Sequence, residues 1–531
     1  MLSKIKAVIQ AFKRRHRIGE FRAFKVPDLA TQKAIMFARA YPAGAIDRLT
    51  ADWFPSTSTG DAEIRFDICS LRDRSRQLER ADPLMRRFLS VLEKNVLKSG
   101  VGFSFQNKAK NPNGTPDFLA NQKVEMAWNE WCKPKNCSEN GEESFYDTCR
   151  LALRSAARDG GILIRKIMGA ENDFRFALRM VEIDHLDINY NVSLGNGNRV
   201  VMGVEKDGIG RTVAYWILDK HPGDMLFGAS PHSRRRFPAS EFIHYFVKER
   251  VTQCVGVPWA APSMIRMHHL EQYQIAELVA AREAANKGGY FTSTTGQPYA
   301  GENEQAVGAD GVLADTGATL AQSQPGQHDE LPPGMSFVPY DPTHPTQQFG
   351  DFVRDCNLGI AAGFDVSYAT LVGDLTRSSF SSMRTGWLDE RESYKKMQAH
   401  MIEHFALQVF ESWLAVQLTT GLKVNLPMSK MSQFNQPNFR GRRWPWVDPE
   451  KDIKAKLMEK EALVTTLDAI IDESDSEMDL EETLAQLGYE QKLQKKHGLT
   501  YVGVGGGQSQ PAKEPSPEPE EVIEDVEPEE K

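Results

Sequence analysis

The sequence lacks the features that mark membrane proteins, secreted proteins and nucleotide-driven motors. None of its 531 residues lie in an apolar run near the roughly 18 uncharged residues that a membrane helix needs. The basic start, MLSKIKAVIQAFKRRHR, breaks its apolar residues with charge and precedes no small-residue cleavage site, so we expect no signal peptide. The P-loop pattern G-x-x-x-x-G-K-[ST] is missing, which argues against a P-loop motor.

Cysteine is scarce and scattered. The six thiols show no regular spacing, which favours reduced cysteines in a cytosolic setting: Cys69, Cys132, Cys137, Cys149, Cys254 and Cys356. Cys132 and Cys137 flank the sequence KPKN, and Cys149 is the nearest further thiol. Because structural zinc needs four ligands, a structural role for these cysteines is favoured over a zinc site.

The net charge of −8 hides an almost neutral body. Residues 513–531 contain nine acidic residues and two lysines and therefore contribute −7, which leaves −1 for the rest of the chain. A body this close to neutral is not built to grip phosphate groups. We expect any contact with DNA to be weak.

The length predicts two to four domains, and the pattern indicates a mixed helix and strand region first. Residues 73–98 have helical spacing, whereas short β-rich stretches follow Gly160. Asp207-Gly208, inside one of these stretches, is a hairpin signal. We therefore expect an α/β domain of about 200 residues.

A helix, a small module and a second helix follow. Ser263 can cap a helix that ends at Gly288-Gly289, and the alanines of this helix allow close packing. A segment rich in Gly, Gln and Pro is bracketed by GGYFTST and MSFVPYDP and indicates either a small β-containing insertion or an extended loop. A second helix is expected in TQQFGDFVRDCNLGIAAGF.

The stretch LVGDLTRSSFSSMRTGW, residues 371–387, is unusually polar for its position between helices. A long amphipathic pattern comes after it and contains His400-Met401-Ile402-Glu403-His404. This pattern matches the inverted zinc-protease motif, but two histidines four residues apart arise easily in a long helix. Residues 449–474 and 477–498 read as two further helices, and the acidic tail is expected to be disordered.

Several stretches resemble the lambda-type portal proteins of tailed bacteriophages, over roughly residues 65–490. They are LRDRSRQLERADPLMRRFLSVLEKNVLKSGVGF, ALRSAARDGGILIRK, CVGVPWAAPSMIRMHHLEQYQIAELVAAREAA and DPTHPTQQFGDFVRDCNLGIAAGFDVSYATLVGDLTRSSFSSMRTGWLDER. The turn R-G-V-P-W of the family is Val255-Gly256-Val257-Pro258-Trp259 here, so Val255 replaces the usual Arg. Phe380 stands where the family's Y-S-S-x-R segment has Tyr, before Ser381, Ser382 and Arg384.

The resemblance implies an α+β multidomain, ring-forming portal fold with an α/β wing, a two-helix stem, a small β-containing clip, a long helix and a helical crown. The expected parts are a basic arm (1–64), the wing (65–262), stem helix 1 (263–287), the clip (288–342), stem helix 2 (343–364), a tunnel loop region (365–386), the long helix and wing return (387–447), the crown (448–500) and the acidic tail (501–531).

The function that the resemblance implies is structural. The chain would form a ring of about twelve copies at one capsid vertex, assembled in the host cytoplasm, through which double-stranded DNA is packaged and ejected without sequence readout. Expected partners are other copies of the chain, the major capsid protein, the terminase large subunit and a head-tail connector protein, with no cofactor or metal. The expected DNA-facing residues are Asp374, Arg377, Ser378, Ser379, Ser381, Ser382 and Arg384. Asp374 could pair with either arginine and reduce its charge.

Three alternatives stay open at this point. One is a head-tail adaptor, another ring protein that lacks a DNA gate. The second is a zinc hydrolase that uses His400, Glu403 and His404. The third is a membrane-anchored pore that uses the basic amino-terminal segment.

Overall fold

The computed structural model describes residues 57–224, 233–285, 289–293, 335–339, 348–376, 379–444, 449–474 and 480–497. The chain separates into two compact units, Met1–Glu63 and Ile64–Lys531. The expected arm lies outside the described residues as far as residue 56. Most of the expected clip, Arg377, Ser378 and the acidic tail also lie outside the described residues. No described helix is long and apolar enough to cross a membrane.

The expected helix at 73–98 is two helices, α3 (Gly60–Ala81) and α4 (Pro83–Val96). The apolar periodicity continues across the junction between the two helices, but Asp82 and Pro83 end one helix and begin the next. Pro83 has no N–H to continue the first helix, and it occupies the first turn of the second, where it is tolerated. The Asp82 carboxylate caps α4 by accepting hydrogen bonds from the amides of Leu84 and Met85 at 2.7 and 3.1 Å.

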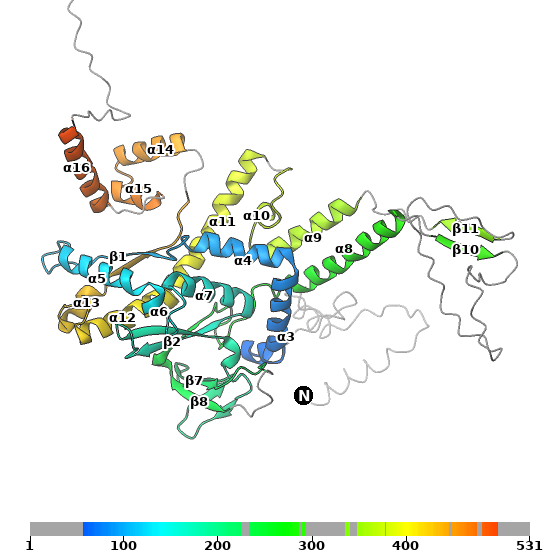
Figure 1. Ribbon diagram of the computed structural model, residues 1–531, viewed down its shortest axis with the longest axis horizontal. Helices are drawn as coiled ribbons and strands as arrows, with labels where there is room; N and C mark the ends of the chain where they lie inside the picture. Colours follow the sequence, from blue (N-terminus) through cyan, green and yellow to red (C-terminus); the bar gives the residue numbers. More distant parts are fainter. Residues whose placement is uncertain are drawn as a thin grey trace, which may run out of the picture. The chain divides into compact units, whose positions relative to one another are not determined.

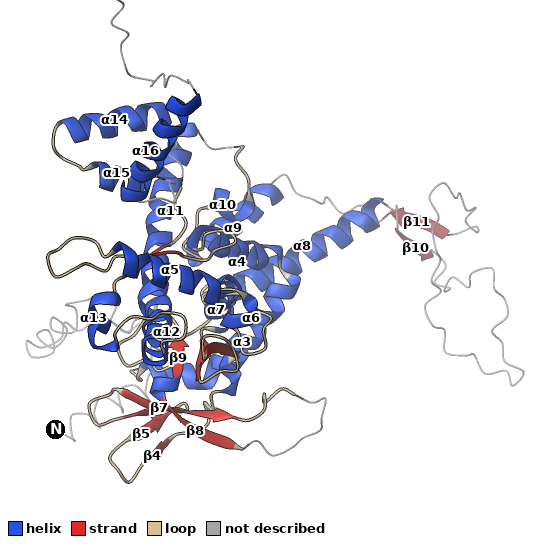
Figure 2. Cartoon of the chain, turned by 60° about the vertical axis from the view of Figure 1, so that its left-hand side comes forward, coloured by secondary structure: helices blue, strands red, loops and turns tan. Residues whose placement is uncertain are grey.

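Two antiparallel sheets form the strand-rich region (Figures 1 and 2). The smaller has the order β3-β2-β9, built from β2 (Ile162–Met168), β3 (Phe176–Val181) and β9 (Phe242–Tyr245). The larger runs in sequence order through β4 (Val192–Ser193), β5 (Arg199–Val201), β6 (Val204–Lys206), β7 (Thr212–Leu218) and β8 (Arg234–Pro238). The hairpin predicted at Asp207-Gly208 is confirmed between β6 and β7, where the Asp207 side chain accepts from the amides of Ile209 and Arg211.

Helices α5 (Phe118–Trp131), α6 (Pro134–Cys137) and α7 (Phe145–Asp159) complete this region, and α7 begins with a capping box of Ser144 and Asp147. Its core also takes in distant residues. Trp128 packs edge-on against Trp413, with ring centroids 5.2 Å apart. Strand β1 (Ser104–Asn107) pairs with β12 (Pro437–Arg440). Residues of the segment 387–447, expected as the long helix and wing return, thus pack into the core of the strand-rich region.

Helix α8 (Met264–Ala285), strands β10 (Gly289–Ser293) and β11 (Met335–Pro339) and helix α9 (Phe349–Gly363) follow in order (Figure 1). The two strands are the brackets predicted for the inserted module, and they pair antiparallel. The Ser263 hydroxyl, expected to cap α8, instead donates to the Ile360 carbonyl of α9 at 3.1 Å. A Cβ on Gly363 would lie 2.1 Å from that hydroxyl oxygen, so this glycine permits the close approach of α8 and α9.

The long helix begins earlier than the expected residue 387. After α10 (Tyr368–Val372), helix α11 runs over Phe380–Met401, and the Ser379 hydroxyl caps it by accepting from the Ser382 amide at 3.2 Å. A π-helical turn (Ile402–Ala406) joins α11 to α12 (Leu407–Thr420), and a short α13 (Met431–Phe434) leads to β12.

The expected crown contains three described helices rather than two. Helix α14 (Pro449–Glu461) ends before Leu463, whose φ of 60° is left-handed backbone that leaves the helix. Thr466 then caps α15 (Leu467–Glu473), and α16 (Leu480–His497) follows. The Arg443 guanidinium ties the preceding segment to α15 by donating to the carbonyls of Ile471 and Ser474.

Candidate functional site

The polar segment, defined here as residues 371–386, is flanked by a hydrogen bond that joins α10 to α11. The Thr370 hydroxyl of α10 donates to the Glu390 carboxylate of α11 at 2.8 Å, and the Tyr394 hydroxyl donates to the same carboxylate. Glu390 is only 7% exposed, so these bonds form in a largely dry environment. Burial, followed by the neighbouring Glu390, raises the pKa of Tyr394 and keeps it a donor. This bond ties α10 to α11 on either side of the segment.

Asp374 has local hydrogen-bond partners in the residues that the structure describes. Its carboxylate accepts from the hydroxyl and amide of Thr376 at 2.6 and 2.9 Å and from the Tyr368 hydroxyl at 3.4 Å. Hydrogen bonds from Thr376 are the main reason that the pKa of Asp374 is lowered. The carboxylate therefore stays ionised, and it fixes the turn after α10.

Arg384 pairs with a residue of α14. Its guanidinium lies 3.3 Å from the Asp452 carboxylate of α14. The suggested pairing of Asp374 with Arg384 is not what the structure shows, because Arg384, in the second turn of α11, pairs with Asp452 of α14 instead. The suggested pairing with Arg377 lies outside the described residues.

Three of the four expected serines are described, and they sit at the start of α11 rather than in a loop. Ser379, Ser381 and Ser382 are all exposed. The hydroxyls of Ser379 and Ser382 are 2.8 Å apart and hydrogen-bonded to each other, while Ser379 also caps α11. Exposed hydroxyls at a helix amino terminus offer neutral donors beside a region of partial positive charge. This surface suits weak contact with an anion.

The described residues do not assemble the zinc site that the histidine motif left open as an alternative. The rings of His400 and His404 lie 4.4 Å apart, but the π-helical turn from Ile402 interrupts the α-helical spacing that the motif needs. Among the described residues, these side chains with Glu403 do not form a group of three ligand atoms within 4.8 Å of one another. Burial, then the nearby His404, lowers the pKa of His400.

The cysteines Cys132, Cys137 and Cys149 do not form such a ligand group within the described ranges either. Burial raises the pKa of all three thiols. Because zinc binds the thiolate form, protonated thiols buried in an apolar core are poor ligands. The structural role expected for these cysteines agrees with their burial.

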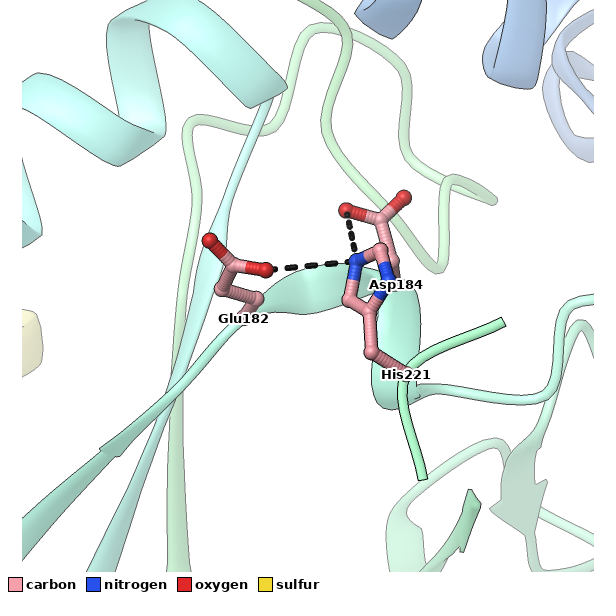
Figure 3. Close-up of side chains that lie close together, drawn as sticks. All are labelled: Glu182, Asp184 and His221. Atoms are coloured by element: carbon pink, nitrogen blue, oxygen red, sulfur yellow. Dashed lines mark ion pairs between the residues drawn. The ribbon is translucent and has the colours of Figure 1, made fainter. Parts of the chain in front are cut away.

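The ligand-like group that the described residues do bring together is Glu182, Asp184 and His221 (Figure 3). Glu182 and Asp184 follow β3, whereas His221 follows β7. The His221 Nε2 atom lies 3.2 Å from Glu182 and 3.7 Å from Asp184. Sequence analysis missed this group because nothing in the local patterns links residues about forty positions apart.

Hydrogen bonding identifies this group as an ion-pair cluster. The Gly223 amide donates to His221 Nδ1 at 3.0 Å, so the neutral ring carries its proton on Nε2, facing the carboxylates. Arg72 and Arg76 bind Asp184 from the other side. Burial opposes ionisation of Asp184, but the bond from Arg76 and the nearby positive charges lower its pKa overall. A metal ion would have to displace a proton and compete with two guanidinium groups.

Comparisons with known proteins agree with the motifs quoted from the sequence. Residues 47–398 match the family described as phage portal protein, lambda family. A probable portal protein of Halomonas phage phiHAP-1 is 32% identical over 448 residues, covering 84% of this chain and 85% of the relative. The portal protein of Escherichia phage N15 is 21% identical over 445 residues, covering 78% and 82%.

Two solved structures also align with the chain. The neck of a native gene transfer agent particle, computed with C12 symmetry, is 13% identical and covers 76% of this chain and 92% of that chain, with a TM-score of 0.38. The neck of an empty gene transfer agent particle, computed with C6 symmetry, is 14% identical with the same coverages and a TM-score of 0.36. On the strength of the family match and the 32% identical relative, this chain belongs to the lambda family of phage portal proteins.

Proposed function

We propose that this protein forms a closed ring of about twelve copies at one vertex of a phage capsid, as the channel for DNA packaging and ejection. The observation that carries the proposal is family membership over residues 47–398. The order of elements supports it, since two packed helices, α8 and α9, flank the antiparallel strand pair β10 and β11 and lead into the polar segment. The role is structural and not enzymatic.

Apolar side chains left exposed on α8 and α9 support self-association. Ile265 and Leu278 on α8 are each 70% exposed, and Phe352 on α9 is 52% exposed. Exposed apolar surface of this kind on packed helices favours burial against another protein. A ring in which each copy uses two different faces would cover such surfaces on every copy.

The polar segment is the part proposed to face DNA. A ring cannot match the symmetry of a duplex, so its lining must touch phosphates without holding them. Every cation that neutralises a phosphate releases counterions and adds affinity. The pairing of Arg384 with Asp452, the ionised Asp374 and the exposed serines together keep the described part of this surface nearly neutral.

Within a virion, the β10–β11 side of α8 and α9 is proposed to meet the terminase large subunit and later a head-tail connector protein. The wing is proposed to contact the major capsid protein, and assembly is proposed to take place in the host cytoplasm. These assignments follow the family's known organisation. The head-tail adaptor alternative gives no reason for the helix, strand pair and helix order.

Replacing Arg377 and Arg384 by Ala tests the lining role. We expect particles that carry this double variant to lose DNA after packaging, because fewer side chains would touch phosphate. The measurement is the genome content of purified particles, with Arg211→Ala in the β6–β7 turn as a control that should retain DNA. Unchanged DNA retention in the double variant would show that the polar segment does not line the channel.

A further inference from the structure

A hollow of about 650 Å³ lies where α3, α4 and α7 meet the end of β3. Five arginines line it: Arg76, Arg80, Arg86, Arg154 and Arg158. The acidic residues that the structure places in its lining are Glu79 and Glu182. This concentration of guanidinium groups has no part in the proposed channel, and we call it the arginine hollow.

Three of these arginines build an ordered floor. Arg154 pairs with Glu79 and Glu93, and Arg158 pairs with Glu79 at 2.9 Å. Arg76 holds Asp159 at 2.8 Å and also binds Asp184. These side chains are each less than a quarter exposed, so the network is preorganised and its charges are largely balanced.

The other two arginines of the hollow are available to bind a ligand. Arg80 in the last turn of α3 and Arg86 in α4 are both exposed. Within the described ranges, neither guanidinium makes an ion pair or hydrogen bond. A second hollow of about 400 Å³ shares Arg76 and Arg80 and extends along α3 to the exposed Arg74. The result is a rim of cationic groups above a neutralised floor.

The shape and the remaining carboxylates favour an acidic polypeptide over duplex DNA. DNA presents a convex rod with a negative charge about every 1.7 Å and needs an extended basic stripe. Glu79, Glu182 and Asp73 interrupt the cationic surface here and would repel such a rod. Single carboxylates on a flexible chain can reach one guanidinium at a time and pair with it in a bidentate way.

We propose that the arginine hollow binds the acidic segment 513–531 of this protein. That segment carries nine acidic residues and two lysines. The residues between the last described position, 497, and position 513 can span up to about 50 Å when extended, which gives the segment a wide reach. The proposal does not depend on ring formation.

The test uses the full-length chain with the nine acidic residues of 513–531 replaced by their amides. A fluorescent peptide with the natural 513–531 sequence is titrated into this protein at low salt, and anisotropy gives the dissociation constant. We expect binding that weakens about tenfold in the Arg80→Ala, Arg86→Ala double variant. The unmodified chain should bind the peptide several-fold more weakly, because its own segment competes.

Arg211→Ala is the matched control, since Arg211 is also exposed but lies in the β6–β7 turn. It should leave peptide affinity unchanged. Absence of peptide binding, or equal affinity with and without Arg80 and Arg86, overturns the proposal. So does a result in which a short DNA duplex, and not the peptide, binds with dependence on these two arginines, because the hollow would then be a phosphate site. Circular dichroism confirms that the variants remain folded.

Discussion

Gly256 shows how one residue determines the junction between the wing and α8. A Cβ at this position would lie 1.8 Å from the Gly160 carbonyl oxygen, and Gly160 itself ends α7 with a φ of 82°. Backbone atoms cannot move aside as a flexible side chain can. The following turn is fixed by the Trp259 amide, which donates to the Ala157 carbonyl at 2.9 Å. The family motif predicted a turn here, but no sequence pattern identified Gly160 as its partner.

Gly256→Ala should therefore destabilise the protein by about 3 kcal/mol, because the added methyl group forces two backbone segments apart. Urea unfolding followed by circular dichroism measures the change in free energy of unfolding. Gly195→Ala is the control, because a Cβ there meets no atom within 4 Å. Equal stability of the two variants would show that the segments do not touch as described.

His244 is a half-buried histidine that sequence analysis did not single out. Burial, followed by repulsion from Arg72, lowers the pKa of His244 to about 3. Its Nε2 atom is buried without a hydrogen-bond partner among the described residues. Because an unfolded histidine titrates near 6.5, the unfolded state binds more protons than the folded state between pH 3 and 6.5.

Stability should thus fall on acidification from pH 6.5 toward pH 3, and the contribution of His244 should be fully present above pH 6.5. We expect His244→Asn to reduce the slope of unfolding free energy against pH by about 1 kcal/mol per unit in this window. The measurement is urea unfolding at a series of pH values. Exposed His268→Asn should keep the wild-type slope, and an unaltered slope in His244→Asn would contradict the assignment.

At the scale of elements, hydrophobic and β-branched patterns located the helices and strands but misjudged several ends. The periodic apolar residues of 73–98 continue across Asp82-Pro83, so the pattern concealed the break that capping chemistry imposes. Helix α11 begins at Phe380 because Ser379 caps it, although its first turn is polar and looked like a loop. Contacts such as Arg384 with Asp452 depend on tertiary arrangement, and sequence spacing could not predict them.

Helix α8 offers a prediction at the scale of an element. Its exposed apolar side chains are expected to be buried against another copy of the chain. Leu278→Asp should prevent association of the copies, since a buried unpaired carboxylate would be costly at the contact. Native mass spectrometry measures the oligomer. Val251→Asp, at a position that is 92% exposed in a loop of the wing, should assemble normally. Assembly of the Leu278→Asp protein would exclude this face of α8 from the contact.

At the scale of the whole molecule, segment order carried more information than any single motif. The quoted stretches predicted the lambda portal family, which the family match and the relatives confirm. The inserted strand pair also lies between its two helices as expected. The arginine hollow and the cluster around His221 were not predicted, because each gathers residues from helices and strands that are distant in sequence.

The central claim is that copies of this chain close into a ring whose opening is lined by the polar segment. Electron cryomicroscopy of the purified full-length protein tests it most directly. We expect annular particles in which residues 371–386 of every copy face the central hole. A ring that carries these residues on its outer rim, or a protein that stays monomeric under assembly conditions, would contradict the claim.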